Sequence, residues 1–494
     1  MRYILALDEG TTSARAALYD PEGRRVAMQS EPIEPVYPRP GWVEQDAEQI
    51  WTAQLAAARR LLEKAGVPAR DIAGIGITNQ RETTVVWERA SGRPIAPAIV
   101  WQCRRTADYC AGLAASPRAA EITRRTGLVV DPYFSASKIR WILEHVPGAG
   151  ARAEAGELLF GTVDTWLAWK LTGGRAHVTD PSNASRTMLM DLARGEWDDT
   201  LLEWFGVPRP MLPRIAPSSA VVGVAEAAWL GAEIPIGGIA GDQQAALAGQ
   251  ACFRAGLSKN TYGTGCFALL HTGDALPVSA NRLLATRAAS TGADAQFAIE
   301  GSVFIAGAAV QWLRDQLGLI ATAAESEALA ASVPDTAGVY LVPAFVGLGA
   351  PHWDPAARGV ITGLTRAAGR AHIVRAALES IAYQTRDLIV AMEADAGRPL
   401  SELRVDGGAA ANNFLMQFQA DILDRPIVRP TDTETTALGA AFLAGLAVGF
   451  WKSVEELESF WRVERVFEPR MPVSRRDQLL DGWREAVARC RWRP

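Results

Sequence analysis

The sequence predicts an α/β fold made of two similar domains. Short apolar, β-branched segments alternate along the chain with segments whose apolar residues recur at helical spacing. The opening pattern, a strand, a turn rich in glycine and threonine and a second strand, occurs again after residue 257. We therefore expect one domain over residues 1–248 and a second over 249–494, with a ligand-binding cleft between them.

The composition argues against several classes of protein. Of 494 residues, 49% are hydrophobic and 21% are charged, as in an ordinary globular protein, and a net charge of −5 argues against general nucleic-acid binding. Five cysteines and five histidines are irregularly spaced, without a disulfide or metal-ligand pattern. The first strand begins at the N-terminus and no apolar segment is long enough to span a bilayer. We expect a cytoplasmic location without stable membrane insertion.

The opening segment combines a buried strand with a polar turn. Residues 3–7 are apolar and predict a strand, and residues 14–19 predict a second one. Between them, Gly10 allows the backbone to approach a ligand, and hydroxyl groups can bind phosphate oxygens. Asp8, at the end of the first strand, is placed to hold a hydrated Mg²⁺. A hairpin with a merely polar turn explains the pattern equally well. The hydroxyl-bearing residues are Thr11, Thr12 and Ser13.

The rest of the first half alternates helices and strands. Asp46 is expected to begin a helix, with Gln49 completing a capping box, and Gly66 to end it. An apolar run over 72–77 predicts a buried strand. The other expected elements are strands over 85–87 and 99–101, a mainly helical region over 111–169 with a strand-to-helix turn at 161–164, a proline-rich connection over 208–217, a strand over 234–240 and a helix over 245–250.

The second half repeats this layout. Residues 257–262 predict a strand that leads into the turn 263–265 and a second strand over 266–271. A long amphipathic pattern over 371–394 predicts a helix. The other expected elements are strands over 297–300, 340–345 and 403–405, and helices over 307–317 and 412–423.

Glycine-rich turns follow strands at residues 8–12, 263–265 and 406–408. Turns with hydroxyl groups in opposite halves suggest that one polyphosphate is bound from both sides. Neither the P-loop pattern nor a G-x-G-x-x-G motif after the first strand is present. The alternative is that these glycines serve only the geometry of the turns.

Three further features could carry chemistry. Asp242, on a strand-to-helix turn, is either a helix N-cap or a general base for phosphoryl transfer to an alcohol. The adjacent Arg81 and Glu82 either bind the hydroxyls of a small polyol or form an exposed ion pair. Three aromatic residues near polar turns either wall the carbon side of a ligand or belong to the core; they are Trp101, Tyr133 and Phe267.

The motifs resemble those of one known family. They include A-L-D-E-G-T-T-S-A-R (6–15), G-I-T-N-Q-R-E-T-T (76–84), I-V-W-Q-C-R-R-T (99–106), G-D-Q-Q-A-A-L (241–247), N-T-Y-G-T-G-C-F (260–267) and R-V-D-G-G-A-A-A-N-N-F-L-M-Q (404–417). Over residues 3–467 the chain resembles the FGGY carbohydrate kinases, of the actin, hexokinase and Hsp70-like ATPase superfamily. The R-E-T-T and W-Q-C-R-R runs resemble its glycerol-specific branch.

The resemblance implies two actin-like, ribonuclease-H-like domains of mixed sheet and helices, with an interdomain active-site cleft that closes over ATP, Mg²⁺ and glycerol. Asp242 would be the general base, and the products would be sn-glycerol 3-phosphate and ADP. Glycerol would contact Arg81, Glu82, Trp101, Tyr133, Asp242, Gln243 and Phe267. ATP would contact Thr11, Thr12, Ser13, Arg15, Thr264, Gly307, Gln311, Gly408 and Asn412. Asp8 and Asp242 would hold Mg²⁺ through water.

Two departures from the family pattern matter. Glu9 stands where the family usually has glutamine, and its additional negative charge would weaken nucleotide binding if the side chain points inward. Residues 227–233 lack Lys and Arg, so we expect no control by fructose 1,6-bisphosphate. The family suggests a homodimer or homotetramer. Phosphorylation of another polyol, or nucleotide binding without catalysis, are the alternative functions.

Overall fold

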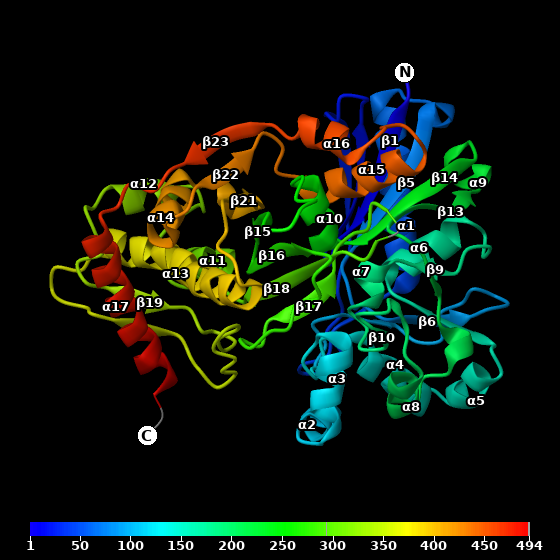
Figure 1. Ribbon diagram of the computed structural model, residues 1–494, viewed down its shortest axis with the longest axis horizontal. Helices are drawn as coiled ribbons and strands as arrows, with labels where there is room; N and C mark the ends of the chain where they lie inside the picture. The colour runs from blue at the N-terminus through cyan, green and yellow to red at the C-terminus, as the bar shows by residue number, and fades with distance from the viewer. Residues whose placement is uncertain (293, 493–494) are drawn as a thin grey trace.

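The computed structural model describes residues 1–292 and 294–492 and consists of two lobes. Figure 1 shows the first half of the chain, in blue to green, on one side and most of the second half, in yellow to red, on the other. Each lobe is built around one mixed sheet with helices packed on it. This architecture confirms the predicted α/β class.

The first sheet has six strands in the order β13-β14-β5-β1-β2-β3. Strands β1, β2 and β3 are antiparallel neighbours, β5 runs parallel to β1, and β14 runs parallel to β5. Their bounds are β1 (Tyr3–Glu9), β2 (Ser13–Tyr19), β3 (Arg25–Pro32), β5 (Ile72–Asn79), β13 (Ser219–Ala225) and β14 (Ile234–Gly241).

The second sheet has seven strands in the order β17-β18-β16-β15-β21-β22-β23. Strands β15, β16 and β18 are antiparallel neighbours, and β21 and β22 extend the sheet in parallel from β15. The two sheets therefore share one central topology, which confirms the repeated layout. The bounds are β15 (Ser258–Tyr262), β16 (Cys266–Gly273), β17 (Leu284–Arg287), β18 (Phe297–Val303), β21 (Leu403–Asp406), β22 (Ile427–Pro430) and β23 (Val463–Phe467).

Helices and short strands complete the lobes. The helices are α1 (Ala47–Ala65), α2 (Ala107–Ala114), α3 (Arg118–Thr126), α4 (Ser135–His145), α5 (Ala149–Glu154), α6 (Val163–Leu171), α7 (Pro181–Ala184), α8 (Asp199–Phe205), α9 (Ala227–Leu230), α10 (Asp242–Gly249), α11 (Gly307–Asp315), α12 (Glu325–Ala331), α13 (Arg370–Ala396), α14 (Asn413–Leu423), α15 (Thr435–Ala447), α16 (Val454–Phe460) and α17 (Val473–Arg491). The short strands are β4 (Glu44–Gln45), β6 (Val85–Glu88), β7 (Ala98–Ile99), β8 (Leu158–Gly161), β9 (Val178–Thr179), β10 (Met190–Asp191), β11 (Glu196–Trp197), β12 (Arg214–Ile215), β19 (Tyr340–Val342) and β20 (Val360–Thr362).

Many of the residues expected to begin or end a helix or strand do so in the structure. Asp46 caps α1 by accepting a hydrogen bond from the Glu48 amide at 2.9 Å, and Gly66 ends the helix in the left-handed region with φ of 64°. The hydrogen bond that the Asp46 side chain accepts is thus with Glu48 and not with Gln49, the expected capping-box partner. The expected strand over 99–101 is shorter than predicted, because β7 ends at Ile99 and Trp101 lies in a turn.

Helix α15, from the second half of the chain, packs on the first lobe. It packs on β1, β5 and β14 and most extensively on α10, and Figure 1 shows it beside these strands. The contact with α10 is backbone to backbone. A Cβ atom on Gly439 would lie 1.8 Å from the Ala245 carbonyl oxygen, and one on Gly249 would lie 1.9 Å from that of Thr435. Only glycine permits this approach. The domain division at residue 248 stays a prediction.

Within the described ranges, we find no helix that combines the length and the apolar character required to cross a membrane.

Candidate active site

The first of the three glycine-rich turns joins β1 to β2. The Gly10 amide donates to the Ser13 carbonyl oxygen at 2.9 Å and closes the turn. Thr11 is held from both sides: its hydroxyl accepts from Trp101 Nε1 at 2.9 Å, and its carbonyl accepts from Gln45 Nε2 at 2.6 Å. The turn is thus a rigid hairpin, in which Thr12 is exposed.

Carboxylates gather around Arg15 beside this turn. Arg15 pairs with Asp8 Oδ2 at 2.9 Å and with Glu434 Oε2, from the segment before α15, at 3.1 Å. Burial raises the pKa of Asp8 to about 6. Arg15 opposes that rise, and the charges of Asp242 and Glu434 add to it. Two carboxylates sharing one arginine form a site with excess negative charge, which suits a hydrated cation. The described residues contain no group of three or more metal-type side chains.

Glu9 is buried with neither carboxylate oxygen hydrogen-bonded to a described residue. Burial and the neighbouring Asp8 raise its pKa well above the usual value of 4.5. This rise favours the uncharged acid, which has the same charge as the glutamine usual in the family. The Glu9 side chain thus points inward, while its raised pKa opposes the negative charge on which the expected weakening of nucleotide binding depends; that effect stays a prediction.

We expect Glu9→Gln to change how stability depends on pH. In the wild type, the unfolded chain releases the Glu9 proton above about pH 4.5 while the folded chain keeps it, so stability falls as pH rises, by about 1.4 kcal/mol per pH unit until the folded pKa is reached. The variant lacks this decline. Thermal midpoints measured from pH 4 upward should therefore favour the variant increasingly until the folded pKa of Glu9 is passed.

The control for this comparison is Glu63→Gln, at an exposed position of α1. It removes an exposed carboxylate from the first lobe and gives the baseline for a glutamate-to-glutamine change in thermal midpoint. If the difference in thermal midpoint between Glu9→Gln and the wild type did not change with pH, Glu9 could not be a buried, protonated acid in the folded chain.

The second turn, residues 263–265, joins β15 to β16 and supports the start of α11. The Thr264 carbonyl accepts hydrogen bonds from the amides of Ala306 at 2.8 Å and Ala308 at 3.1 Å, and the Gly307 amide donates to Gly263 at 3.0 Å. A Cβ atom on Gly307 would lie 2.5 Å from the Gly263 carbonyl oxygen. The structure thus brings Thr264 and Gly307 together, while Gln311 lies exposed one turn further along α11.

The third turn lies beside the second. Gly407 has φ of +83°, and a Cβ atom there would lie 2.6 Å from the Tyr262 carbonyl oxygen. Gly408 faces open space, with no heavy atom within 4 Å of its Cβ position. Asn412 caps α14 through a hydrogen bond from the Leu415 amide at 2.9 Å. The close approach of Gly407 to Tyr262 places residues 406–412 beside the second turn.

Asp242 is the first residue of α10, directly after β14. The N-cap position belongs to Gly241, so the interpretation of Asp242 as an N-cap is wrong. Its Oδ1 accepts from the Gln243 amide at 2.7 Å and lies 3.1 Å from Arg81 Nε. The side chain is 32% exposed while that of Arg81 is 2% exposed. The carboxylate is thus fixed by a buried arginine and still open to a ligand.

Arg81 and Glu82 are buried, so the interpretation as an exposed ion pair is wrong. Glu82 has φ of 61°, in the left-handed region that a residue with a side chain rarely adopts. The hydroxyls of Thr84 and Ser135 each donate to its carbonyl oxygen at 3.1 Å. Strain of this kind persists where surrounding contacts enforce it, and it is frequent at ligand sites.

Sequence reasoning missed Glu300 and Arg186, which complete this cluster. Glu300 accepts from both terminal nitrogens of Arg81, at 2.5 and 2.9 Å, and from Arg186 Nη2 at 3.1 Å. Arg186 Nε also donates to Glu82 at 2.7 Å. Burial works against ionisation of Glu300, but Arg186 and Arg81 outweigh it and lower its pKa to about 2. A charged residue inside the apolar strand F-A-I-E-G-S-V was the available signal.

The three aromatic residues are each half-buried, and Trp101 and Tyr133 pack against a hydrophobic core of the first lobe. The Trp101 and Tyr133 rings meet edge to face, with centroids 5.6 Å apart, and the Arg186 guanidinium lies 5.5 Å from the Tyr133 ring. Phe267 is brought to Gln243 through the buried Lys259, whose ammonium donates to the Gln243 side chain and to the Phe267 carbonyl. Burial lowers the pKa of Lys259.

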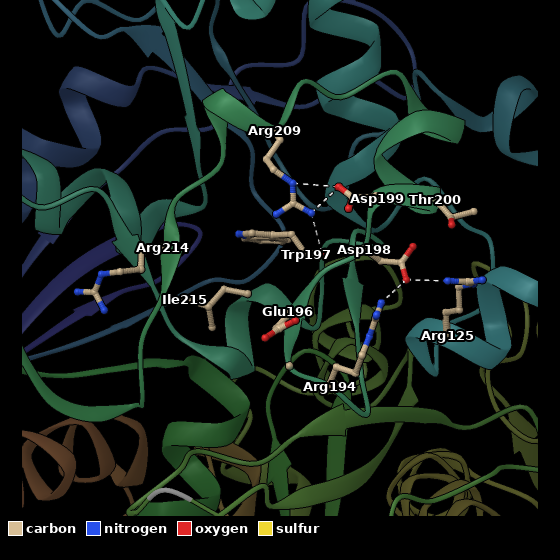
Figure 2. A pocket seen from close by; sticks show the side chains of 11 residues that line it. Arg125, Arg194, Glu196, Trp197, Asp198, Asp199, Thr200, Arg209, Arg214 and Ile215 are labelled. Atoms are coloured by element: carbon tan, nitrogen blue, oxygen red, sulfur yellow. Dashed lines mark hydrogen bonds and ion pairs between the residues drawn. The ribbon is translucent and has the colours of Figure 1, made fainter.

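The large hollow in Figure 2 lies elsewhere, in the first lobe, and has a volume of about 510 Å³. None of the predicted site residues lines it. Arg125 and Arg194 both bind Asp198 at 2.7 Å, and Arg209 binds Asp199 at 2.5 Å. Three of the four lining arginines are thus ion-paired with aspartates of the same lining, and the hollow is separate from the site described above.

Comparison with known proteins adds to this geometry. The N-terminal-domain model of the FGGY family of carbohydrate kinases matches residues 3–249, and the C-terminal-domain model matches residues 258–448. The chain belongs to the FGGY family of carbohydrate kinases. A glycerol kinase of Symbiobacterium thermophilum is 58% identical over 99% of this chain and 98% of its own length. Glycerol kinase 2 of Thermotoga maritima is 57% identical over 99% of both chains.

Solved structures of other kinases share the fold. A Plasmodium falciparum glycerol kinase with ADP superposes with a TM-score of 0.94 at 35% identity, covering 100% of this chain and 99% of that one. A xylulose kinase from Rhodospirillum rubrum superposes with a TM-score of 0.86 at 27% identity, covering 99% and 98%. Kinases named for different substrates thus share this architecture, so the acceptor must be argued from the site.

Proposed function

We propose that this FGGY kinase transfers the terminal phosphoryl group of ATP to glycerol and releases sn-glycerol 3-phosphate and ADP. The observation that carries the proposal is the contact of the partly exposed Asp242 carboxylate with the buried Arg81–Glu82 pair. The full-length relatives named glycerol kinase support the choice of acceptor.

The acceptor site would combine polar groups on one side with aromatic rings on the other. Arg81 offers donors and Glu82 acceptors, and each glycerol hydroxyl is both donor and acceptor. Asp242 would take the proton of the primary hydroxyl as it attacks phosphorus. The remaining residues proposed to contact glycerol are Tyr133 and Gln243 through polar groups, and Trp101 and Phe267 against the carbon atoms.

The nucleotide would lie between the two lobes. The first turn offers hydroxyls and backbone amides to the phosphates from one side, and the second turn does so from the other. The Trp101–Thr11 hydrogen bond joins the acceptor wall to the phosphate turn, which would keep the two substrates in register. The residues proposed to contact ATP are Thr11, Thr12, Ser13 and Arg15, then Thr264, Gly307 and Gln311, with Gly408 and Asn412 near the adenosine.

Asp8 and Asp242 fit a role in holding Mg²⁺ through water. Asp8 Oδ2 is buried and forms an ion pair with Arg15 but no hydrogen bond, and the Asp8 and Asp242 carboxylates are close enough to influence each other. When bound, the ion would neutralise charge on the phosphates. Arg15 holds Asp8 in place for this purpose.

The test is ADP release from Mg-ATP by the purified protein with glycerol, dihydroxyacetone, xylulose, gluconate or no acceptor. We expect glycerol to give the highest kcat/KM by at least about tenfold, because a site built to hydrogen-bond particular hydroxyls discriminates strongly. A different best acceptor would replace glycerol in the proposal. ADP release at the level of the blank with every acceptor, despite ATP binding, would favour a non-catalytic role.

Four further expectations remain proposals: a cytoplasmic location, a homodimer or homotetramer, absence of nucleic-acid binding, and absence of control by fructose 1,6-bisphosphate. The segment relevant to the last one contains α9 and is packed on Arg59, whose guanidinium donates to the carbonyls of Ala228 and Trp229. It presents no cation of its own to a bisphosphate.

A further inference from the structure

We propose that Glu300 is a positioning residue for phosphoryl transfer: from the second lobe it fixes the Arg81 guanidinium, and Arg81 in turn holds the Asp242 carboxylate. This inference rests on the proposed function, because it concerns the acceptor half of the same site. It adds a residue that makes no contact with Asp242 itself and acts through another side chain.

The first argument is the geometry around Arg81. Two of its nitrogens bind the two oxygens of Glu300, at 2.5 and 2.9 Å, and the third, Nε, faces Asp242 at 3.1 Å. A planar guanidinium bound at both terminal nitrogens cannot rotate, so its remaining N–H has one direction. Glu300 therefore fixes the direction in which the Arg81 Nε–H group faces Asp242.

The second argument is the balance of buried charge. Two arginines and two glutamates form the cluster, and every one of their side chains is at most 2% exposed. Removing one carboxylate would leave a buried arginine uncompensated, which is costly. Arg81 would then keep only two carboxylates nearby, the partly exposed Asp242 at 3.1 Å and the buried Glu82 at 3.9 Å, and its contact with Asp242 would change. The four residues are Arg81, Arg186, Glu82 and Glu300.

The third argument is that Glu300 comes from the opposite sheet. Arg81 follows β5 and Asp242 follows β14 in the first sheet, whereas Glu300 lies in β18 of the second. Figure 1 shows β17 and β18 at the junction of the two lobes. Neighbouring contacts fix the junction: the Ser185 and Thr286 hydroxyls are 2.9 Å apart, and Arg287 Nε donates to the Leu192 carbonyl at 2.8 Å. Asp242 is thus aligned only when the two sheets adopt this arrangement.

The experiment is a double-mutant cycle of Glu300→Gln and Asp242→Asn. The glutamine has nearly the shape of the glutamate, but one of its oxygens becomes an NH₂ group that cannot accept from Arg81. In the wild-type background, we expect Glu300→Gln to lower kcat with glycerol about 10- to 100-fold, the effect of misplacing a catalytic group. In the Asp242→Asn background, the same change should lower kcat by less than about threefold, because the group that Glu300 positions is already lost.

Two controls separate positioning from a loss of fold. Glu379→Gln removes a comparable buried carboxylate of the second lobe, one that pairs with Arg375 at 2.7 Å on α13. It should keep kcat within about twofold of the wild type even if it unfolds at a lower temperature. ADP affinity of Glu300→Gln, measured by calorimetry, should also stay within about twofold, since the phosphate turns are untouched.

Either of two results would overturn the inference. One is a Glu300→Gln variant that keeps more than half of the wild-type kcat. The other is an equal fold-loss in both backgrounds, which would mean that Glu300 acts on folding and not through Asp242. A wild-type protein without glycerol-dependent turnover would instead contradict the proposed function, and that result is seen before any variant is made.

Discussion

Asp242→Asn is expected to lower kcat with glycerol about 10²- to 10⁴-fold, the usual loss when a general base is removed. Asparagine keeps the size of the side chain and can still lie against Arg81, so the fold and glycerol binding should change little. Only the ability to take the hydroxyl proton is lost. Steady-state kinetics with saturating Mg-ATP and glycerol measure the effect.

The matched control for Asp242→Asn is Asp199→Asn. Asp199 is also the first residue of a helix, α8, and is also paired with an arginine, but it lies in the hollow of Figure 2, away from the phosphate turns. This variant should keep kcat within about twofold. A folded Asp242→Asn protein with most of its wild-type kcat would contradict the assignment of the base.

Gly439→Ala is expected to have the largest effect on stability. Its Cβ atom would lie 1.8 Å from the Ala245 carbonyl oxygen of α10, and backbone cannot rotate away as a side chain can. Helix α15 would have to move off α10, and we expect a loss of about 3 kcal/mol or more in the free energy of unfolding. Denaturant unfolding measures this loss.

The same substitution should also reduce activity, because α10 begins with Asp242. Gly112→Ala is the control: Gly112 lies in α2 with no heavy atom within 4 Å of its Cβ position. Alanine there should leave activity unchanged and stabilise the helix by about 0.5–1 kcal/mol. If Gly439→Ala were as stable as Gly112→Ala, the close packing of α15 on α10 would be wrong.

Most strands, helices and turns could be predicted because their signals are local. The apolar run over 72–77 becomes β5, Gly66 ends α1, and the turn at 263–265 lies between two strands as its glycines indicate. The repeat of strand, turn and strand was sufficient to predict two similar sheets. Trp101 was misassigned to a strand: it lies in a turn closed by the hydrogen bond from the Cys103 amide to the Val100 carbonyl at 2.9 Å, and its own amide donates to the Thr83 hydroxyl at 3.2 Å.

The sequence named candidate residues for the site, but it did not predict the hydrogen bonds and ion pairs that join them. Motifs identified Arg81, Glu82 and Asp242. The adjacent charges of Arg81 and Glu82 favoured an exposed ion pair, and the strand-to-helix turn at Asp242 left a helix cap as an equal alternative to a general base. Both interpretations failed because burial and helix register depend on elements distant in the sequence. The resemblance, rather than spacing, assigned these residues to one acceptor site.

By itself the sequence determined the strands and helices, the glycine turns and the identity of the family, because these depend on patterns within a few residues or on whole motifs. Only the tertiary structure decided that Glu300 and Arg186 join Arg81, that Glu434 approaches Arg15, and that α15 returns to the first lobe. The physical reason is that desolvation and ion pairing act through space. A charged side chain in a strand acquires its role only when packing removes water and supplies its partners.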